Sequence, residues 1–486
     1  MAELFLGIDL GTTSVKAALL TPDGHCAQRF GQSYPTARPG PGLAEQDPQD
    51  WLDLIAAALH AFAAHGVAGK IGFGCLSSQV NTHVFADRTG KALAPAILWQ
   101  DTRATAEAAE LDAQLTTDQK IAFLGAPIPV DASHPLARML WMARHRPDVW
   151  AQTAFVLLPK DYCLLHLTGQ VVTDPVANVG LVGPDLHYVT PILDLVPGAA
   201  QRMAPLAGVT DVVGRIGQGF ALSGVQMVNG TMDGWAGLYG AGASREGATV
   251  WLSGTSEVLG ICAANATGAP GVVVFPPIGG LRLHAGPTQS GGASQMWFCQ
   301  MAGVSVEALT AELHATPRRN PTPLFLPQLA GERAPVWDAS LRGAFLGLDS
   351  GMHRVDLGRA VLEGVALSAR HVLTALHASA GTIADTLTCG GGGFQSDPWG
   401  QIRADVVNRP LLRLAVNEPA VLGAVALACL GSGAATDLAQ AQAALAQHDM
   451  HWLPNPARRG LYDDLFGVYL EAQAANAAIG RKLRHL

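Results

Sequence analysis

The chain of 486 residues has few of the features that mark several protein classes. Charged residues make up 14% of it and aromatic residues 6%, and its formal net charge is −8. No group of lysines and arginines is dense enough to follow a phosphate backbone, so nucleic acid is not an expected partner. No apolar run reaches the roughly 18 residues that a membrane-spanning helix needs, so no membrane partner is expected either.

Cysteine is also sparse and unpatterned. The seven cysteines include no Cys-x-x-Cys pair, and an odd number argues against a disulfide framework and for a reducing compartment. Cys75, Cys262 and Cys429 lie in apolar surroundings and are interpreted as core residues. The first expected strand begins within a few residues of Met1, which leaves no room for a signal peptide, so we expect a cytoplasmic protein.

Residues 4–20 form the first pattern with chemical content. Residues 4–10 are typical of a buried strand and residues 15–20 of a second one, and between them lies the turn Gly11-Thr12-Thr13-Ser14. Its backbone N–H groups and three hydroxyls suit a polyphosphate. The turn is not a P-loop, because no Gly-Lys-Ser/Thr follows a strand and opens a helix.

The same pattern recurs at residues 249–260, around Ser253-Gly254-Thr255-Ser256. Two such hairpins indicate an internal duplication. Two residues before the turn glycine, the first copy has Asp9 and the second has Leu252. Only the first hairpin is therefore expected to hold a metal ion.

Residues 231–242 contain one acidic side chain, Asp233, among small and apolar residues. A carboxylate placed there, where the backbone allows a ligand to come close, suits a general base for a hydroxyl group. The alternative is a tight Asp-Gly turn. A third pattern is the run Gly390 to Gly393 after the strand-like residues 385–389, which offers a flat surface for a purine and ribose.

Two longer stretches, residues 133–145 and 343–364, match signatures of a known family. Arg138 stands where that family usually has lysine. With these stretches, the hairpins and the glycine run, the chain resembles the FGGY family of carbohydrate kinases, which have the actin-like ATPase fold. Residues 329–335 resemble a Gly-Glu-Arg-x-Pro segment of xylulokinase-like members, and this places the chain closest to them.

The resemblance implies an α/β fold of two actin-like ATPase (ribonuclease H-like) lobes, each a mixed β-sheet flanked by helices, with the active site in the cleft between them. We expect an N-terminal lobe over residues 1–243 and a C-terminal lobe over 244–486, which agrees with a chain too long for one core. The periodicity of apolar residues predicts helices over 50–65, 105–115, 357–378 and 436–448, and strands over 70–76, 250–252 and 387–389.

The resemblance also assigns roles. Asp233 would accept the proton of the attacking hydroxyl, and Asp9 would hold Mg²⁺, which accompanies the co-substrate ATP. The residues expected to bind ATP are Thr12, Thr13, Ser14, Lys16, Gly254, Thr255, Gly292, Gly391, Gly392, Gly393 and Asp397. For Lys16, strand alternation equally allows a side chain that simply faces solvent.

The expected sugar-binding residues are Gln79, Val80, Asn81, Trp99, Asp101 and Asp233. Trp99, Asp101 and Arg103 follow the family's Trp-x-Asp-x-Arg pattern, in which the indole lies against the carbon skeleton. After Gln79, xylulokinases usually have Met-His and glycerol kinases Arg-Glu, whereas this chain has Val80-Asn81. His83 is interpreted as a structural residue.

The predicted function is transfer of the ATP γ-phosphoryl group to a hydroxyl of a small sugar, with a pentulose such as D-xylulose as the leading substrate. The alternatives are a polyol or aldonate kinase of the same family, acting on glycerol, erythritol, a pentitol or gluconate, and an actin-fold ATPase that senses sugar without transferring phosphate. The residues do not decide the oligomeric state, and a homodimer is one state that they allow.

Overall fold

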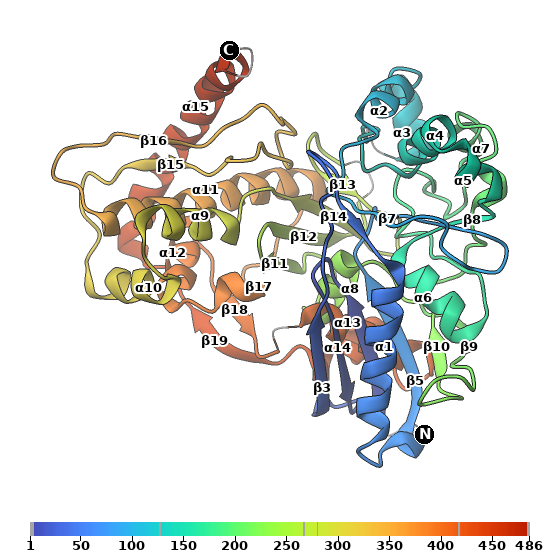
Figure 1. Cartoon of the computed structure of the whole chain (residues 1–486). Coiled ribbons are helices and arrows are strands. Elements are labelled where there is room, and N and C mark those ends of the chain that lie inside the picture. Colours follow the sequence, from blue (N-terminus) through green and yellow to red (C-terminus); the bar gives the residue numbers. More distant parts are fainter. Residues whose placement is uncertain (1–3, 126–127, 266–267, 279, 417, 484–486) are drawn as a thin grey trace. The chain divides into compact units, whose positions relative to one another are not determined.

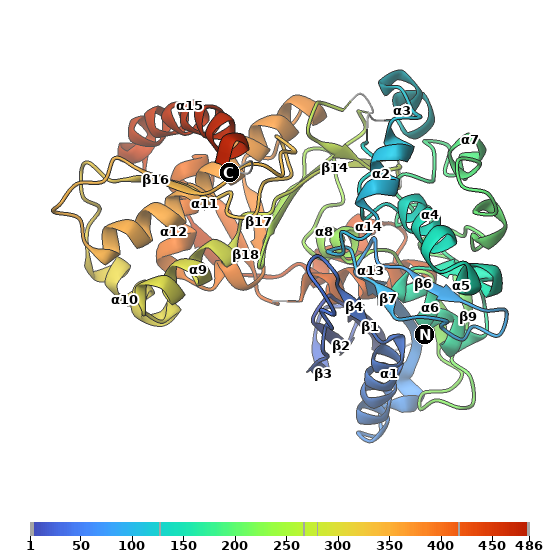
Figure 2. The same cartoon turned by 45° about the horizontal axis from the view of Figure 1, so that its top comes forward.

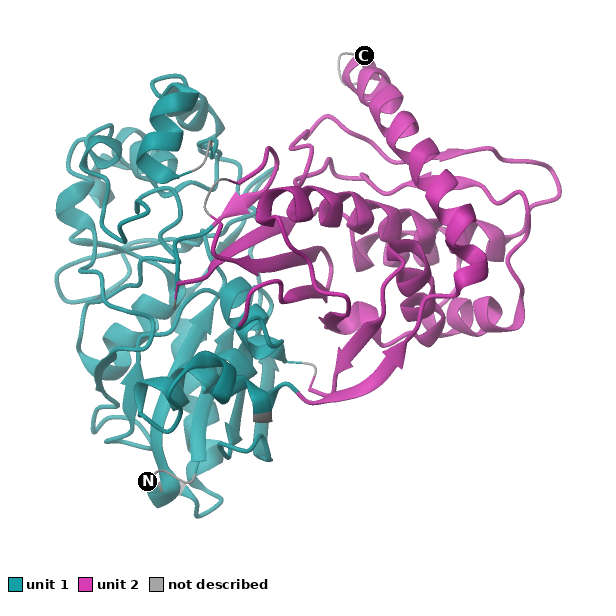
Figure 3. Cartoon of the chain, turned by 180° about the vertical axis from the view of Figure 1, so that it is seen from behind, with its two compact units in different colours: residues 1–244, 275–279, 418–446 teal, residues 245–274, 280–417, 447–486 magenta. Residues whose placement is uncertain are grey.

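The computed structural model describes residues 4–125, 128–265, 268–278, 280–416 and 418–483. The chain forms two compact units, coloured separately in Figure 3. Unit 1 comprises residues 1–244, 275–279 and 418–446, and unit 2 comprises residues 245–274, 280–417 and 447–486. Each unit contains a mixed β-sheet with helices, which confirms the predicted α/β class. Unit 1 thus includes a segment that the chain adds only after most of unit 2.

The main sheet of unit 1 has six strands in the order β3-β2-β1-β5-β10-β9. Their bounds are β1 Leu4–Leu10, β2 Ser14–Leu20, β3 Cys26–Ser33, β5 Ile71–Ser78, β9 Val212–Arg215 and β10 Gln226–Val228. Two smaller sheets pair β4 (Glu45–Gln46) with β7 (Ala96–Ile97) and β6 (Val84–Ala86) with β8 (Phe155–Leu157).

The helices of unit 1 are α1 Pro48–Ala63, α2 Thr105–Asp112, α3 Thr117–Leu124, α4 Pro135–His145, α5 Pro147–Gln152, α6 Pro159–Thr168, α7 Thr190–Leu193, α8 Asp233–Gly240, α13 Pro419–Gly431 and α14 Leu438–Leu445. Short 3₁₀ turns lie at η1 Ala68–Lys70 and η2 Ala200–Arg202. The predicted helices at 50–65, 105–115 and 436–448 correspond to α1, α2 and α14, with shifted ends.

Alternation along β1 gives each face of the sheet its own partner. Leu6, Ile8 and their neighbours on one face share a core with Trp51 and Ile55 of α1, which lies along the sheet in Figures 1 and 2. Gly7 faces the other way, where a Cβ would lie 2.6 Å from the carbonyl oxygen of Val421 in α13. Asp9 follows Gly7 by two residues and therefore belongs to the face covered by α13.

The main sheet of unit 2 has seven strands in the order β13-β14-β12-β11-β17-β18-β19. Its elements are β11 Thr249–Ser253, β12 Glu257–Ala263, β13 Val273–Val274, β14 Arg282–Pro287, α9 Gly292–Ala302, α10 Val306–Ala315, β15 Leu324–Leu326, β16 Ala344–Leu346, α11 Arg354–Ala380, β17 Leu387–Gly390, η3 Gly392–Phe394, α12 Asp397–Val407, β18 Leu411–Leu414, β19 His448–Trp452, η4 Pro456–Arg458 and α15 Arg459–Leu483. Strands β15 and β16 form a separate pair.

The two main sheets repeat the same pattern of strand pairing, and the sheet of unit 2 has one further edge strand, β13. In unit 1, β1 pairs antiparallel with β2 and parallel with β5, which pairs parallel with β10. In unit 2, β11 pairs antiparallel with β12 and parallel with β17, which pairs parallel with β18. The structure thus confirms the internal duplication that the two hairpins indicate. Among the described residues, no helix is both long enough and apolar enough to cross a membrane.

Candidate active site

Asp9 lies near the end of β1, between Lys16 on β2 and Ser77 on β5. The Ser77 hydroxyl donates a hydrogen bond to Asp9 Oδ1 at 3.0 Å. Burial raises the pKa of Asp9 to about 6, although the Ser77 hydrogen bond and the charge of Lys16 act to lower it. Lys16 is half-buried and its charge acts on Asp9, and its contact with phosphate stays a prediction.

Asp233 is the first residue of α8, and the Asp-Gly pair opens this helix instead of forming an isolated turn. The N–H of Gly234 donates to Asp233 Oδ1 at 2.7 Å, and the helix N-terminus favours negative charge. Burial raises the pKa of the half-buried Asp233 to about 7, and the charge of Asp9 raises it further toward this value. A carboxylate that titrates near pH 7 is suited to accept a proton under neutral conditions.

The position of α8 depends on close packing against α13. A Cβ on Gly423 of α13 would overlap the carbonyl oxygen of Ala236 in α8, and a Cβ on Gly240 would overlap the carbonyl oxygen of Pro419. Glycine at both positions lets the two backbones touch. The same helix α13 packs on β1, so one element supports both carboxylates.

The backbone of the first hairpin turn is held by hydrogen bonds to its carbonyl groups. The N–H of Gly11 donates to the carbonyl of Ser14 at 3.1 Å, and the hydroxyl of Tyr34 donates to the carbonyl of Gly11. Gln46 Nε2 donates to the carbonyl of Thr12 at 2.7 Å. Thr13 is exposed at the tip. The turn is therefore fixed through its carbonyl groups.

Two of the predicted sugar-pocket residues connect to this turn. The indole N–H of Trp99 donates to Thr12 Oγ1 at 3.0 Å. Gln79 is buried, donates to Gln46 Oε1 at 2.9 Å, and accepts from the hydroxyl of Thr82 at 3.2 Å. The structure thus brings Thr12, Gln79 and Trp99 together through Gln46 and Thr82.

Val80 and Asn81 follow β5 and are half-buried. Asn81 adopts the left-handed conformation with φ of 52°, which asparagine tolerates better than most residues. Its amide donates to Ser133 Oγ at 3.3 Å, and its carbonyl accepts from the buried guanidinium of Arg138. Arg138 also donates to the carbonyl of Ile97 at 2.9 Å, so the signature arginine supports the loops that carry Asn81 and Trp99.

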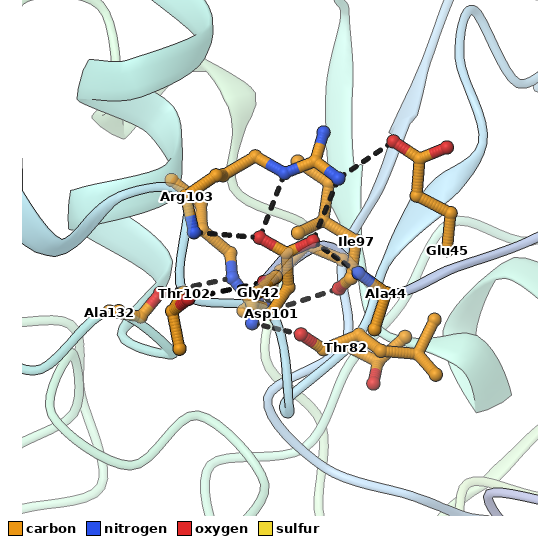
Figure 4. Close-up of polar contacts among 12 residues, drawn as sticks. Gly42, Ala44, Glu45, Thr82, Ile97, Asp101, Thr102, Arg103 and Ala132 are labelled. Carbon is orange, nitrogen blue, oxygen red and sulfur yellow. Dashed lines mark hydrogen bonds and ion pairs between the residues drawn. The ribbon is translucent and has the colours of Figure 1, made fainter. Parts of the chain in front are cut away.

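Asp101 has a different surrounding from the one expected for a substrate contact (Figure 4). Its Oδ1 accepts from the backbone N–H and Nε of Arg103 at 2.9 and 2.8 Å, and its Oδ2 accepts from Arg103 and from the Ala44 N–H, each at 2.7 Å. Its side chain is fully buried. Both oxygens are occupied, so Asp101 orients Arg103, which also donates to Glu45 at 2.7 Å.

His83 is structural, as expected. It is buried, and burial together with the charge of Arg138 keeps its pKa well below the usual range. The neutral ring places Nδ1 3.0 Å from Arg138 Nη1, where it accepts a hydrogen bond.

In unit 2, the second hairpin adjoins the start of α9. The N–H groups of Gly292 and Ala293 donate to the carbonyls of Gly254 and Thr255 at 2.9 and 3.0 Å. A Cβ on Gly292 would lie 2.6 Å from the carbonyl oxygen of Gly254. Glycine is thus required for this contact, which joins three of the predicted ATP-binding residues.

The glycine run also packs on the second hairpin. A Cβ on Gly391 or Gly393 would overlap atoms of Ser253 at the end of β11, and Gly391 has φ of 91°. Gly392 is open to solvent. Asp397 begins α12, is exposed, and accepts from the indole N–H of Trp452 at 2.6 Å.

A buried arginine connects these elements. Arg403 donates to the carbonyl of Gly393 at 2.7 Å, to Ser253 Oγ at 2.8 Å and to Glu257 Oε1 at 2.5 Å. Its guanidinium carbon lies 3.8 Å from the ring centre of Trp399 and 4.2 Å from that of Phe394. Arg403 therefore ties the second hairpin to the glycine run.

Comparison with known proteins places the chain in a family. A model of the FGGY family of carbohydrate kinases, N-terminal domain, matches residues 4–218, and the C-terminal domain model of that family matches residues 250–432. A xylulose kinase from Klebsiella pneumoniae is 30% identical over 415 residues, covering 83% of this chain and 84% of the relative. The chain belongs to the FGGY family of carbohydrate kinases.

Solved structures agree. A gluconate kinase from Lactobacillus acidophilus matches with a TM-score of 0.90 at 25% identity, covering 99% of both chains. A ligand-bound xylulose kinase from the same organism matches with a TM-score of 0.89 at 25% identity, again over 99% of both chains. The predicted family, fold and sugar-kinase activity are confirmed, and ATP and a sugar are the two substrates of such a kinase.

The carboxylates of this FGGY kinase suit a metal ion that is shared with the substrate. In the part of the chain that the structure describes, no group of three or more His, Cys, Asp and Glu side chains is arranged to hold an ion. Mg²⁺ in kinases is usually bound by one or two carboxylates with waters and substrate phosphates. Asp9, whose charge raises the pKa of the nearby Asp233, is a carboxylate that fits this kind of site.

Sequence reasoning missed several residues of this FGGY kinase that hold its site together. Gln46, Ser77 and Tyr34 act through single hydrogen bonds from distant segments, and no local pattern marks them. For Arg403 the sequence gives a weak indication of a buried role, because this charged residue follows Trp399 by four residues on an otherwise apolar helix face.

Proposed function

We propose that this kinase transfers the γ-phosphoryl group of Mg-ATP to a hydroxyl of a pentulose such as D-xylulose. The observation that carries the proposal is Asp233, a half-buried carboxylate at a helix N-terminus whose pKa is raised to about 7. In phosphoryl transfer, the protein mainly positions the groups and neutralises charge. A base of this kind is the main proton-transfer group that such chemistry needs.

In the proposed reaction, Asp233 accepts the proton of the attacking sugar hydroxyl. Gln79, Val80 and Asn81 line the sugar from the end of β5, and Trp99 supplies an apolar wall. Asp101 fixes Arg103, whose guanidinium donates to sugar oxygens. Arg103 is also stacked near Trp141, with 5.1 Å between its guanidinium carbon and the ring centre, so its direction is set from two sides.

For ATP, we propose that the turn residues Thr12, Thr13 and Ser14, with Lys16, bind phosphate oxygens. Gly254, Thr255 and Gly292 do the same from the second hairpin, and Gly391, Gly392, Gly393 and Asp397 bind the nucleoside. Asp9 would hold Mg²⁺ through water, and the ion would neutralise charge on the phosphates.

The substrate class rests on the relatives and on one segment. Curated xylulose kinases align with nearly the whole chain, and the Gly-Glu-Arg-x-Pro segment at residues 331–335 is of their type. An aldonate or polyol is the second candidate, favoured by Val80-Asn81, which departs from the usual Met-His pair. The amide of Asn81 both donates and accepts hydrogen bonds, which suits a polyol chain.

The test is ADP release with Mg-ATP against D-xylulose, other ketopentoses, pentitols, erythritol, glycerol and gluconate, with a blank without sugar. Turnover that is greatest on a ketopentose supports the proposal. Turnover on a polyol or gluconate alone overturns the pentulose assignment and leaves the kinase. ATP hydrolysis that no sugar changes supports the sensor alternative.

Asp233→Asn tests the proposed base. The change keeps the shape of the side chain but removes its basicity, so we expect kcat to fall about 10²- to 10⁴-fold while ATP binding changes little. The matched control is Asp118→Asn, an exposed carboxylate in the first turn of α3. Wild-type turnover by Asp233→Asn would show that another group takes the proton.

A further inference from the structure

A buried charge cluster lies in unit 1 outside the groups assigned to the reaction. Lys160 Nζ lies 2.6 Å from Asp161 Oδ1 and 3.0 Å from Asp174 Oδ2, and it donates to Asn229 Oδ1 at 3.3 Å. All four side chains are buried. Burial alone would lower the pKa of Lys160, but the two aspartates raise it overall, so the amine stays charged.

The cluster holds the chain segment that leads to Asp233. The hydroxyl of Thr231 donates to Asp174 Oδ1 at 2.9 Å, and that oxygen also accepts the N–H groups of Val176 and Ala177 at 3.0 and 2.9 Å. Asn229 Nδ2 donates to the carbonyls of Thr173 and Ala207 at 3.1 and 3.0 Å. Asn229 and Thr231 are thus both fixed before α8 begins.

A second connection runs through β5. The backbone N–H of Lys160 donates to Ser78 Oγ at 3.1 Å, and Ser78 pairs in parallel with Met232, the residue before Asp233. The neighbouring Ser77 donates to Asp9. The backbone at Lys160 is thus joined to β5, whose Ser77 and Ser78 lie beside Asp9 and Met232.

The start of α8 needs such support. Its N-cap residue is Met232, whose side chain makes no capping hydrogen bond. The N–H of Gly234 donates to Asp233 Oδ1, but a helix whose N-cap residue supplies no acceptor frays more readily. The segment before the helix therefore adds to the restraint that packing against α13 gives to α8.

We propose that Asp174, Thr231 and Lys160 are positioning residues, which hold the Asp233 carboxylate in the position and orientation that proton transfer requires. The proposal rests on the proposed role of Asp233 as the base. Misplacement of a reacting group by about 1 Å costs on the order of 10²-fold in rate. Buried ion pairs add little stability compared with apolar residues of similar size, so stability alone does not account for the cluster.

Thr231→Val tests this with little change in volume, and Thr231→Ser restores the hydroxyl. We expect Thr231→Val to lower kcat about 10- to 100-fold, with KM for ATP within about 2-fold of wild type. Thr231→Ser should recover most of kcat. The control Lys120→Met removes another ion pair of unit 1, in which Lys120 Nζ lies 2.6 Å from Asp112 Oδ1. This variant should lower Tm without lowering kcat.

Suppose that Asp233→Asn is inactive, as expected. Wild-type kcat in Thr231→Val, or equal losses of kcat in the Val and Ser variants, would then overturn the positioning proposal alone. If Asp233→Asn is active, the proposed base and its positioning both fail. Should Thr231→Val not fold, Ser78→Ala removes the second connection and is expected to lower kcat in the same way; an unchanged kcat there would contradict the proposal.

Discussion

At the scale of single residues, the candidate site contains two carboxylates, for which we propose different roles. Asp233 has its pKa raised to about 7 and Asp9 to about 6, in both cases mainly by burial. A hydrogen bond from Ser77 and the charge of Lys16 keep Asp9 the more acidic of the two. Near pH 7, Asp9 is therefore mostly ionised while Asp233 can still exchange a proton.

This difference predicts the pH dependence of the reaction. If Asp233 is the base, as proposed, it is active only when deprotonated, and its pKa lies above the ordinary value, so kcat/KM should fall as the pH drops below about 7. Well below the pKa, the loss should approach 10-fold per pH unit. Initial rates from pH 5 to 9 at saturating Mg-ATP measure it, with Asp118→Asn as the control. An acid limb near pH 4 would mean that the base titrates as an exposed carboxylate.

At the scale of elements, the strand β1 and the helices α8 and α13 bring the carboxylates together. Strand alternation directs Asp9 to the face that α13 covers, and glycines at the α8–α13 contact let α8 come close. Neither effect involves a polar interaction with a ligand. The relative positions of the two carboxylates therefore depend on how β1, α8 and α13 pack.

Gly423→Ala tests this packing. The added methyl group would overlap the carbonyl oxygen of Ala236, so we expect a loss of about 2 kcal/mol or more in the free energy of unfolding, with lower kcat. The control Gly467→Ala lies in α15 with no atom near the new methyl group, and it should stabilise the protein by about 0.5–1 kcal/mol. Urea denaturation measures both. A neutral Gly423→Ala would show that the two helices can separate.

At the scale of the whole molecule, the two units share a pattern of strand pairing but differ in the side chains that their hairpins carry. The first hairpin carries Asp9, whereas the second has Leu252 at the corresponding place and a buried Glu257–Arg403 pair, 2.5 Å apart, beneath its turn. The residue proposed to hold Mg²⁺ and the proposed base thus both belong to unit 1. Unit 2 offers backbone groups and glycines, which suit a nucleotide.

This division of residues between the two units predicts that Arg403→Lys weakens the binding of ATP but not that of the sugar. Lysine cannot reproduce the several hydrogen bonds and the aromatic stacking of arginine. We expect KM for ATP to rise about 10-fold, corresponding to about 1.4 kcal/mol, while KM for the sugar stays within about 2-fold. Arg354→Lys, in the exposed pair with Glu312, is the control and should change neither KM. Equal increases in both KM values would contradict the division.

The sequence by itself determined the fold class, the duplication and the central acids. Hairpins, glycine turns and helices with apolar spacing are local patterns, so residues 4–20, 249–260 and 390–393 could be recognised without coordinates. Asp9 and Asp233 stood out because each is an acid among apolar or small residues. The resemblance to the family then led to the roles that we propose for them.

Only the tertiary structure decided how these acids are held and which neighbours are free to bind. It showed that Asp101 is saturated by Arg103 and Ala44, that Arg403 joins the second hairpin to the glycine run, and that residues 418–446 return to unit 1. These contacts join segments far apart in the chain. Their partners depend on packing, which leaves no periodic or local trace in the order of residues.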